Sequence, residues 1–477
     1  MAVSRSSFPI MPGAAVAWAQ SSDGANTTPQ QQIFLPLISE DSGVTAQTPA
    51  QPSTNLATVH AAAVGSSGVL CSTSSSPNAS FTFTASADYI SMPDGNTIWT
   101  WSYSPSGGAF QFPGPVLCVN QGDTVTVVLH NSLPEATSIM FLGIDNVLAN
   151  GAPAQPEFNG PSGALSSLTN SAAANGSVTY SFVASKPGTY LYESGTDVGK
   201  QVQMGLYGAM IVRPTPTANC PRTATQDCAY TDYGAFLPAT EYVLLLSEMD
   251  PNLHAAIELG QPYDVTTLHP RYWLINGRAF PDTIAANNAP WLPAQPYSGL
   301  VHVTVTDQNV NPNQPPALVR YLDAGSLGHP FHPHAQNGRV IARDATPLRD
   351  GGGNDLSYET FAFTINSGQT WDQLYTYEDQ EHFDPTSNPV PVTMPQLQNL
   401  TFKDNATYYS GSPYLGKKGQ LPVGVTSFNE CGEFYMVWHS HALNEVANYD
   451  AGFGGMLTLE RIDPLPGHQA TGTTCTP

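Results

Sequence analysis

Charged residues are scarce in this chain, and basic residues are the scarcer kind. Only 11% of the 477 residues are charged, and 15 Lys and Arg stand against 37 Asp and Glu, for a formal net charge of −22. A chain with no basic stripe cannot neutralise phosphates, which argues against nucleic acid and against anionic membranes as partners. No apolar run reaches the 18 or more residues of a membrane-spanning helix. These absences predict a soluble protein with no membrane span and no nucleic-acid partner.

Several motifs are also absent. The sequence contains no GxSxG, Walker, HExxH or Rossmann pattern, which removes the corresponding hydrolase, nucleotide and dinucleotide functions. No two of the six cysteines stand at Cys-x-x-Cys spacing, so cysteine ligation of a metal is disfavoured. An even number of cysteines is typical of the disulfides of an exported protein. Cys220 and Cys228 are close enough to close a small loop, whereas the pairing of the other four stays open.

The N-terminus has the features of an export signal followed by a linker. Arg5 precedes a weakly apolar stretch that ends in Ala17-Trp18-Ala19, so residues 1–19 are interpreted as a signal peptide. Residues 20–77 are rich in Ser, Thr, Ala, Gln and Pro, a composition typical of a disordered, flexible leader. The apolar patch Ile33–Ile38 interrupts it, as a docking segment or as a solvated tether. We therefore expect a secreted or cell-surface protein.

Turn residues dominate the remainder, with 42 Pro and 41 Gly. Short alternating runs such as Phe81-Thr-Phe-Thr84, separated by Gly, Pro, Asn and Asp, predict an all-β protein built from β-sandwiches. Residues 186–214 resemble residues 432–461, because both read as a strand, a polar loop and a Gly-rich entry to a final strand. This duplication predicts one domain over residues 78–215, a connection over 216–239, a second domain over 240–463 and a tail over 464–477.

Two short segments concentrate the histidines. His329-Pro-Phe-His332-Pro-His334 and His439-Ser-His441 each contain a His-x-His step within a predicted strand. Because strand side chains alternate between faces, residues i and i+2 project to the same side. Each pair therefore directs two imidazoles at one point, and imidazole suits copper, zinc, iron or nickel. The other half of the duplication has Glu193-Ser-Gly195 where the second has His439-Ser-His441, so only one half carries candidate ligands.

Five segments together resemble the multicopper oxidases, a family that includes laccases: SLPEATSIMFLGI, PGTYLYESGTDVGKQVQMGLYGAMIV, YWLINGRAFPD, HPFHPHAQNGRVIARD and WHSHALNEVANYDAGFGGMLTLE. The resemblance covers about residues 78–463 and is closest to the two-domain members. It implies two cupredoxin-like Greek-key sandwiches. It also implies that His332, His334, His439 and His441 match trinuclear copper ligands, that His329 matches a type 1 copper ligand and that Met456 matches the axial one.

The chain departs from the family pattern at the remaining copper positions. The first-domain His-x-His motifs are replaced by Met140-Phe-Leu142 and Glu193-Ser-Gly195. Ser440 occupies the position of the type 1 Cys, and Glu445 that of the second type 1 His. A hydroxyl cannot provide the thiolate of a blue copper site, so full laccase activity is not expected. The copper sites are therefore interpreted as degenerate.

The resulting hypothesis is one metal ion bound by His332, His334, His439 and His441, with copper favoured and zinc as the alternative. At most a slow copper-dependent redox reaction is expected, and its catalytic residues stay undefined. His329 and Glu193 are candidates for a further ligand or for a group that orients one. The competing hypothesis is a metal-free binding or structural protein tethered through its N-terminal linker. The homotrimer of the two-domain relatives is weakly implied, because the first-domain ligands are missing.

Overall fold

The computed structural model describes residues 67–160, 163–309, 311–378, 400–401, 407–408 and 434–463. The predicted signal peptide, the patch Ile33–Ile38, the tail 464–477, Cys431 and Cys475 lie outside these ranges. Within them the chain is mostly β-strand with two short α-helices, α2 (Val198–Gln201) and α3 (Pro251–Glu258). None of the described helices has the length and apolarity needed to cross a membrane.

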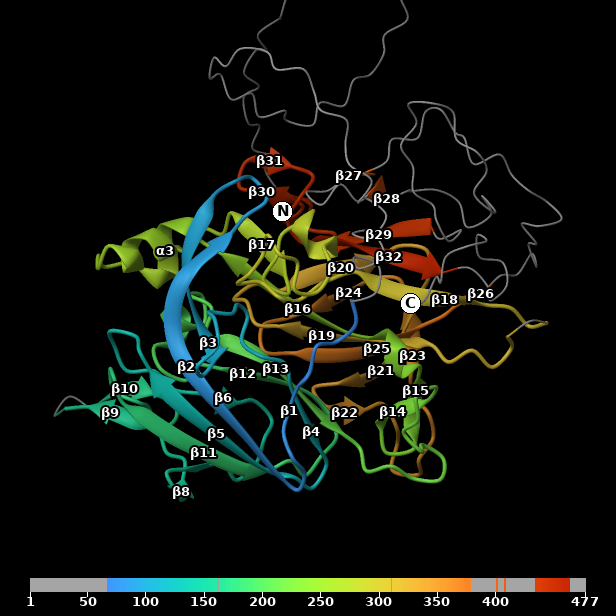
Figure 1. The fold of residues 1–477 in the computed structure, drawn as a ribbon, viewed down its shortest axis with the longest axis horizontal. Helices are drawn as coiled ribbons and strands as arrows, with labels where there is room; N and C mark the ends of the chain where they lie inside the picture. The colour runs from blue at the N-terminus through green and yellow to red at the C-terminus, as the bar shows by residue number, and fades with distance from the viewer. Residues whose placement is uncertain are drawn as a thin grey trace, which may run out of the picture. The chain divides into compact units, whose positions relative to one another are not determined.

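The first half of the chain forms two sheets that face each other across one apolar core (Figure 1). One sheet runs in the order β1 (Ser72–Thr73), β4 (Leu117–Asn120), β13 (Tyr207–Arg213), β12 (Gly188–Glu193) and β6 (Met140–Phe141). The other runs β3 (Thr97–Pro105), β2 (Asn78–Ser91), β5 (Thr124–Asn131), β11 (Ser177–Val183), β7 (Leu148–Ala149) and β8 (Ala152–Pro153). A separate hairpin joins β9 (Glu157–Asn159) and β10 (Ala164–Ser167).

Alternation along the strands builds this core. In β2, Ala79, Phe81, Phe83 and Ala85 are buried while the residues between them are exposed or half-buried. Strand side chains alternate between the two faces of a sheet, so the apolar face of β2 packs inward. β2 pairs in parallel with β5, and β4 with β13, and such pairings between strands that are not consecutive require crossover connections.

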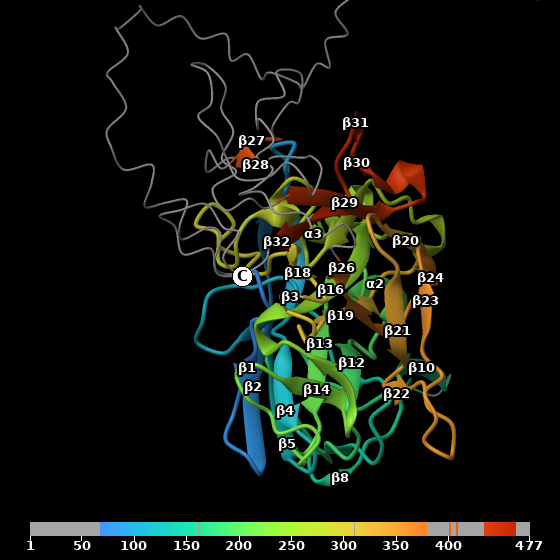
Figure 2. The same cartoon turned by 90° about the vertical axis from the view of Figure 1, so that its right-hand side faces the viewer.

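The second half repeats this plan with larger sheets. One contains β22 (Thr346–Pro347), β21 (Gly338–Arg343), β25 (Thr370–Tyr375), β19 (Ala317–Asp323), β16 (Glu241–Met249), β17 (Tyr272–Ile275), β30 (Ala447–Asn448) and β31 (Ala451–Gly452), with β23 (Tyr358–Thr360) beside β21. The other contains β24 (Phe363–Ile365), β20 (His329–Pro333), β29 (Phe434–Ser440), β32 (Leu457–Asp463), β18 (Val301–Thr306) and β26 (Tyr377–Glu378). In Figure 2, β29 and β32 run side by side in red. The prediction of an all-β protein with two cupredoxin-like sandwiches is confirmed.

Short elements complete the described chain. The hairpin of β14 (Asp227–Tyr230) and β15 (Tyr233–Phe236) lies between the halves in sequence. A further pair joins β27 (Leu400–Thr401) and β28 (Thr407–Tyr408). The 3-10 turns are η1 (Pro238–Thr240), η2 (Val265–Thr267), η3 (Asp282–Ile284) and η4 (Leu443–Glu445).

The predicted linker ends before residue 77, which corrects the sequence interpretation. β1 pairs with β4 at Ser72 and Thr73, and a disulfide joins Cys71 to Cys118. The backbone N–H of Val69 also donates to the carbonyl of Glu241. The polar composition of this segment resembles that of a linker, but a covalent bond and a strand pairing attach it to the first sandwich. The second disulfide, Cys220–Cys228, forms as predicted.

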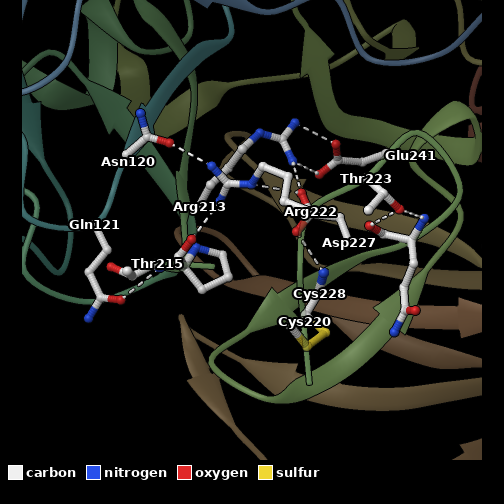
Figure 3. Close-up of polar contacts among 12 residues, drawn as sticks. Asn120, Gln121, Arg213, Thr215, Cys220, Arg222, Thr223, Asp227, Cys228 and Glu241 are labelled. Atoms are coloured by element: carbon white, nitrogen blue, oxygen red, sulfur yellow. Dashed lines mark hydrogen bonds and ion pairs between the residues drawn. A yellow bond between two sulfur atoms is a disulfide. The ribbon is translucent and has the colours of Figure 1, made fainter. Parts of the chain in front are cut away.

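The two sandwiches share an apolar and a charged contact. Side chains of β4 and β13 pack with side chains of β16 and β19 in one buried cluster. Figure 3 shows Arg213 at the end of β13 bonded to Glu241 at the start of β16, with 2.6 Å between Nη2 and Oε2. Arg222 in the connecting segment donates to Asn120 and pairs with Asp227, next to the Cys220–Cys228 disulfide. Buried ion pairs with these extra hydrogen bonds are costly to break on one side only.

Candidate metal centre

The two histidine pairs lie on neighbouring strands. β20 and β29 pair in antiparallel fashion, with His332 directly opposite His439. Along β20 the burial alternates, so His329 and Phe331 point inward while His332 lies on the outer face. His334 and His441 follow two residues after His332 and His439, and both are exposed. The strand pairing therefore carries both pairs to the same face of the sheet.

The four imidazole rings form a single cluster. The ring centroids lie 4.5 Å apart for His332 and His334, and 5.1 Å apart for His334 and His439. His441 lies 5.5 Å from His332 and 5.5 Å from His439, and the opposed pair His332 and His439 are 5.9 Å apart. The structure thus brings together all four residues that the sequence singled out.

Hydrogen bonds define which ring nitrogens remain free for a ligand. Nδ1 of His332 lies 2.7 Å from the carbonyl oxygen of Phe361, and Nδ1 of His439 lies 2.7 Å from that of Ser440. A carbonyl only accepts hydrogen bonds, so both Nδ1 atoms carry the proton and both Nε2 atoms keep a lone pair. Metal-binding histidines are commonly held in this way, with the second ring N–H donated to a carbonyl.

The surroundings of two of the rings, His334 and His439, lower their pKa. Burial lowers the pKa of His334, and the three neighbouring imidazoles lower it further. Burial likewise lowers the pKa of His439, although its hydrogen bond to the Ser440 carbonyl works in the opposite direction. These shifts favour the neutral form of His334 and His439, and neutral imidazole is the form of histidine that binds metals in proteins.

The donor set fits copper or zinc in type, and the geometry fits in part. Nε2 of His334 lies 3.1 Å from Nε2 of His439, close enough for both to reach one ion, because metal–nitrogen bonds are about 2.0–2.1 Å long. Within the described ranges, no three His, Cys, Asp or Glu side chains already stand at coordinating positions. Side-chain rotation of the other two rings would be needed to enclose an ion.

His329 does not join the four rings. It is fully buried on the opposite face of β20, with Nδ1 2.9 Å from Oε2 of Glu445 and Nε2 3.3 Å from Oε2 of Glu248. Its nitrogens thus face carboxylates in the interior. Burial tends to lower the pKa of His329, but the hydrogen bonds to Glu248 and Glu445 outweigh it and raise the pKa to about 10. The structure therefore places His329 apart from the four rings, between two buried carboxylates.

Glu193 occupies in the first sandwich the strand position that His439 occupies in the second. It ends β12, where it stands opposite Met140 of β6, as His439 stands opposite His332. Burial raises its pKa to about 7. Gly195, two residues on, borders a cavity of about 600 Å³ that Ser167, Thr196 and Lys200 also line. The structure therefore places Glu193 in the first sandwich sheet, in contact with Met140 and Tyr207 across the strand pairings.

The residues at the expected type 1 positions form a buried polar group. The Ser440 hydroxyl donates to Oε2 of Glu445, the same oxygen that His329 contacts. Met456 is fully buried in the core of the second sandwich, and its N–H donates to the carbonyl of Glu445. This is a hydroxyl, a carboxylate and an imidazole, and it lacks the thiolate of a blue copper site.

Sequence reasoning missed two members of this group, Glu248 and Asp323. Glu248 lies near the end of β16 and Asp323 ends β19, and both are buried. Burial raises the pKa of Asp323 to about 7, although His329 works against this. The available signal was a carboxylate at the end of a long apolar strand, Tyr242-Val-Leu-Leu-Leu-Ser-Glu248, where burial of an acid demands a partner.

Comparisons with known proteins agree with this architecture. Residues 107–217 match the family model described as multicopper oxidase. Multicopper oxidase CTB12 of Cercospora beticola is 36% identical over 110 residues, which is 23% of this chain and 16% of that protein. L-ascorbate oxidase of Cucumis sativus is 38% identical over 106 residues, 22% of this chain and 16% of that protein. The matched part of the chain thus spans about a sixth of the length of these relatives.

Solved structures share the fold over most of the chain. The blue copper oxidase from Nitrosomonas europaea superimposes with a TM-score of 0.50 at 17% identity, covering 81% of this chain and 85% of its own. Multicopper oxidase mgLAC gives a TM-score of 0.51 at 16% identity, covering 80% and 86%. The chain therefore resembles multicopper oxidases in sequence over residues 107–217 and shares their fold over most of its length. The sequence match itself lies mainly in the sandwich that lacks the histidine pairs.

Proposed function

We propose that this is an exported protein of the multicopper oxidase family that binds one metal ion, with copper as the favoured ion, at His332, His334, His439 and His441. The observation that carries the proposal is the convergence of the four rings, with the Nδ1 atoms of His332 and His439 engaged by backbone carbonyls. The donor set supports the proposal because neutral imidazoles suit copper and zinc.

A copper ion held there would supply a one-electron redox centre. The chain's own contribution is to orient His332 and His439 through the carbonyls of Phe361 and Ser440. Burial also lowers the pKa of His334 and His439, which favours neutral rings there. Exposed His334 and His441 leave the cluster open to small reductants. Because Ser440 and Glu445 provide no thiolate for a fast electron relay, the activity we propose is slow copper-dependent oxidation rather than efficient laccase catalysis.

Export is part of the proposal. Two disulfides, Cys71–Cys118 and Cys220–Cys228, support it because disulfides persist in oxidising compartments. A secreted or cell-surface location also agrees with the signal-like segment of residues 1–19.

A metal-free binding or structural protein is the second candidate. One observation favours it: His334 and His439 already satisfy each other with a 3.1 Å contact between their Nε2 atoms. Two rings bonded to each other need no ion to compensate their polar atoms. In that case the sandwich would be retained for its surfaces.

Metal analysis after copper loading and desalting separates the two candidates. We expect one copper ion per chain and no intense blue absorption band. The double variant His439→Ala/His441→Ala should lose the ion. The matched control, His130→Ala/His269→Ala, removes two exposed histidines outside the cluster and should keep it. A wild-type protein without copper after loading would overturn the metal proposal in favour of the second candidate.

A further inference from the structure

The same two strands that carry the histidine pairs are joined on their inner face by a buried polar contact. Ser440 stands between His439 and His441, and its side chain points to the opposite side of β29 from their rings. Its hydroxyl donates to Oε2 of Glu445, which also lies 2.9 Å from Nδ1 of His329 at the start of β20. The contact therefore bridges the strand of one pair to the strand of the other.

All three groups are enclosed. The exposed fractions are 0% for Ser440 and His329 and 4% for Glu445. Burial strengthens hydrogen bonds to charged groups and makes an unpaired partner costly. A shift of β29 along β20 would break these bonds inside the protein, so the contact resists changes in the strand register.

The backbone holds Glu445 in place from the other side. Its carbonyl accepts the N–H of Met456, and Gly455 packs against it so closely that a Cβ atom there would lie 2.2 Å from the Glu445 oxygen. Gly455 also has φ of +61°, which glycine adopts without strain. The loop from η4 to β32 therefore fixes the carboxylate against the two strands.

Further polar groups anchor His329. Its Nε2 contacts Oε2 of Glu248 at 3.3 Å, and Oε1 of Glu248 accepts from the side chain of Gln203 at 2.8 Å. Gln203 belongs to the first sandwich, between α2 and β13. A chain of hydrogen bonds from His329 through Glu248 to Gln203 thus connects the second sandwich to the first, which has no histidine pairs.

We propose that Ser440, Glu445 and His329 form a positioning clip that sets the separation of the two His-x-His pairs and so determines the metal affinity of the four-histidine cluster. The inference rests on the proposed function, since it assigns to the clip the role of orienting the ligands of that site. Groups that support metal ligands in this way commonly change metal affinity by about 10–100-fold when removed.

The test compares two buried serines of the second sandwich. Ser440→Ala removes the clip hydroxyl, and we expect copper(II) affinity, measured by competition with a chelator of known affinity, to fall about tenfold at unchanged stoichiometry. Ser247→Ala is the matched control, because Ser247 is 1% exposed and also takes part in a buried hydrogen bond. Its partner is the Tyr207 hydroxyl, 2.9 Å from the Ser247 Oγ, and not a member of the clip. The copper affinity of this variant should remain at the wild-type value. Glu445→Gln, which keeps the side-chain shape, should act in the same direction as Ser440→Ala.

Two readouts distinguish positioning from a loss of stability. The electron paramagnetic resonance signal of bound copper(II) should change in Ser440→Ala and stay unchanged in Ser247→Ala, even where both lower the melting temperature equally. In the metal-free protein, imidazole ¹⁵N shifts should show a weakened contact between His334 and His439 in Ser440→Ala. Wild-type affinity and unchanged ¹⁵N shifts in Ser440→Ala would overturn the clip. A wild-type protein that binds no copper would overturn the proposed function, while the ¹⁵N comparison would still decide the clip.

Discussion

The two sandwiches place different chemistry on the same backbone. In the first, Glu193 at the end of β12 stands opposite Met140 of β6; in the second, His439 near the end of β29 stands opposite His332 of β20. One residue earlier, Tyr192 and Trp438 are both fully buried. The inward-facing residue is a large aromatic side chain in both halves, because it fills a core, whereas the residue that follows it differs between the halves.

The difference extends to electrostatics. Burial raises the pKa of Glu193 to about 7 and lowers the pKa of His439. Burial disfavours the charged form of either group, so the acid and the base at this position are both moved towards neutrality. Only the imidazole, with its lone pair, becomes a good metal ligand by this change. The position is therefore suited to a neutral group in both halves, and the residue type decides whether it can bind a metal.

The largest expected effect concerns the separate cores of the two sandwiches. Tyr192→Ala and Trp438→Ala should each lower the free energy of unfolding by about 3–5 kcal/mol, because each removes a fully buried aromatic ring and leaves a cavity. Denaturant unfolding followed by circular dichroism measures this. Phe453→Ala, at a side chain 62% exposed, is the control and should change the value by less than about 1 kcal/mol. A large loss in one half only would break the equivalence of the two cores.

The next effect concerns the buried charges beneath the histidine pairs. His329 has a folded pKa of about 10 against 6.5 normally, so the folded protein keeps a proton between these pH values that the unfolded chain has lost. The stabilisation of the folded protein by protonated His329 is therefore complete below pH 6.5 and is lost as the pH rises towards 10. Between pH 7 and pH 10, we expect the free energy of unfolding of the wild type to fall by about a few kcal/mol more than that of His329→Gln. This is the order of magnitude that the shift of the His329 pKa implies.

Urea titrations at both pH values measure this loss. His269→Gln, at an exposed histidine, should keep the wild-type slope. Parallel slopes for the wild type and His329→Gln would show that the buried carboxylates do not retain the proton on His329.

The smallest effect concerns Glu193. The pKa of Glu193 in the folded protein, about 7, lies above the ordinary 4.5. The wild type therefore loses stability as the pH rises from about 4.5 to 7, and above 7 it carries the full free-energy cost of burying an ionised carboxylate. Glu193→Gln removes this cost. The variant should match the wild type near pH 4.5 and exceed it at pH 8 by about 1 kcal/mol, since partial exposure reduces the effect. Melting curves at the two pH values test this, and a constant difference between them would contradict it.

Local patterns explain how far the sequence could lead. The alternation Phe81-Thr-Phe-Thr84 and the abundance of turn residues are enough to predict a β-sandwich, because side-chain period and turn chemistry are properties of neighbouring residues. The resemblance between residues 186–214 and 432–461 likewise predicted equivalent strands. Residues 67–77 were misassigned, since neither the Cys71–Cys118 pairing nor the parallel pairing of β1 is visible in local composition.

The sequence by itself determined that each His-x-His step presents two rings to one side, because alternation along a strand is local. Only the tertiary structure decided that His332 stands opposite His439, since these strands are far apart in the chain and pair through the register of the sheet. It also decided that His329, three residues from His332, turns inward to Glu248 and Glu445. Odd and even positions of one strand belong to different environments, and only the packing of the sheet defines which of them is the interior.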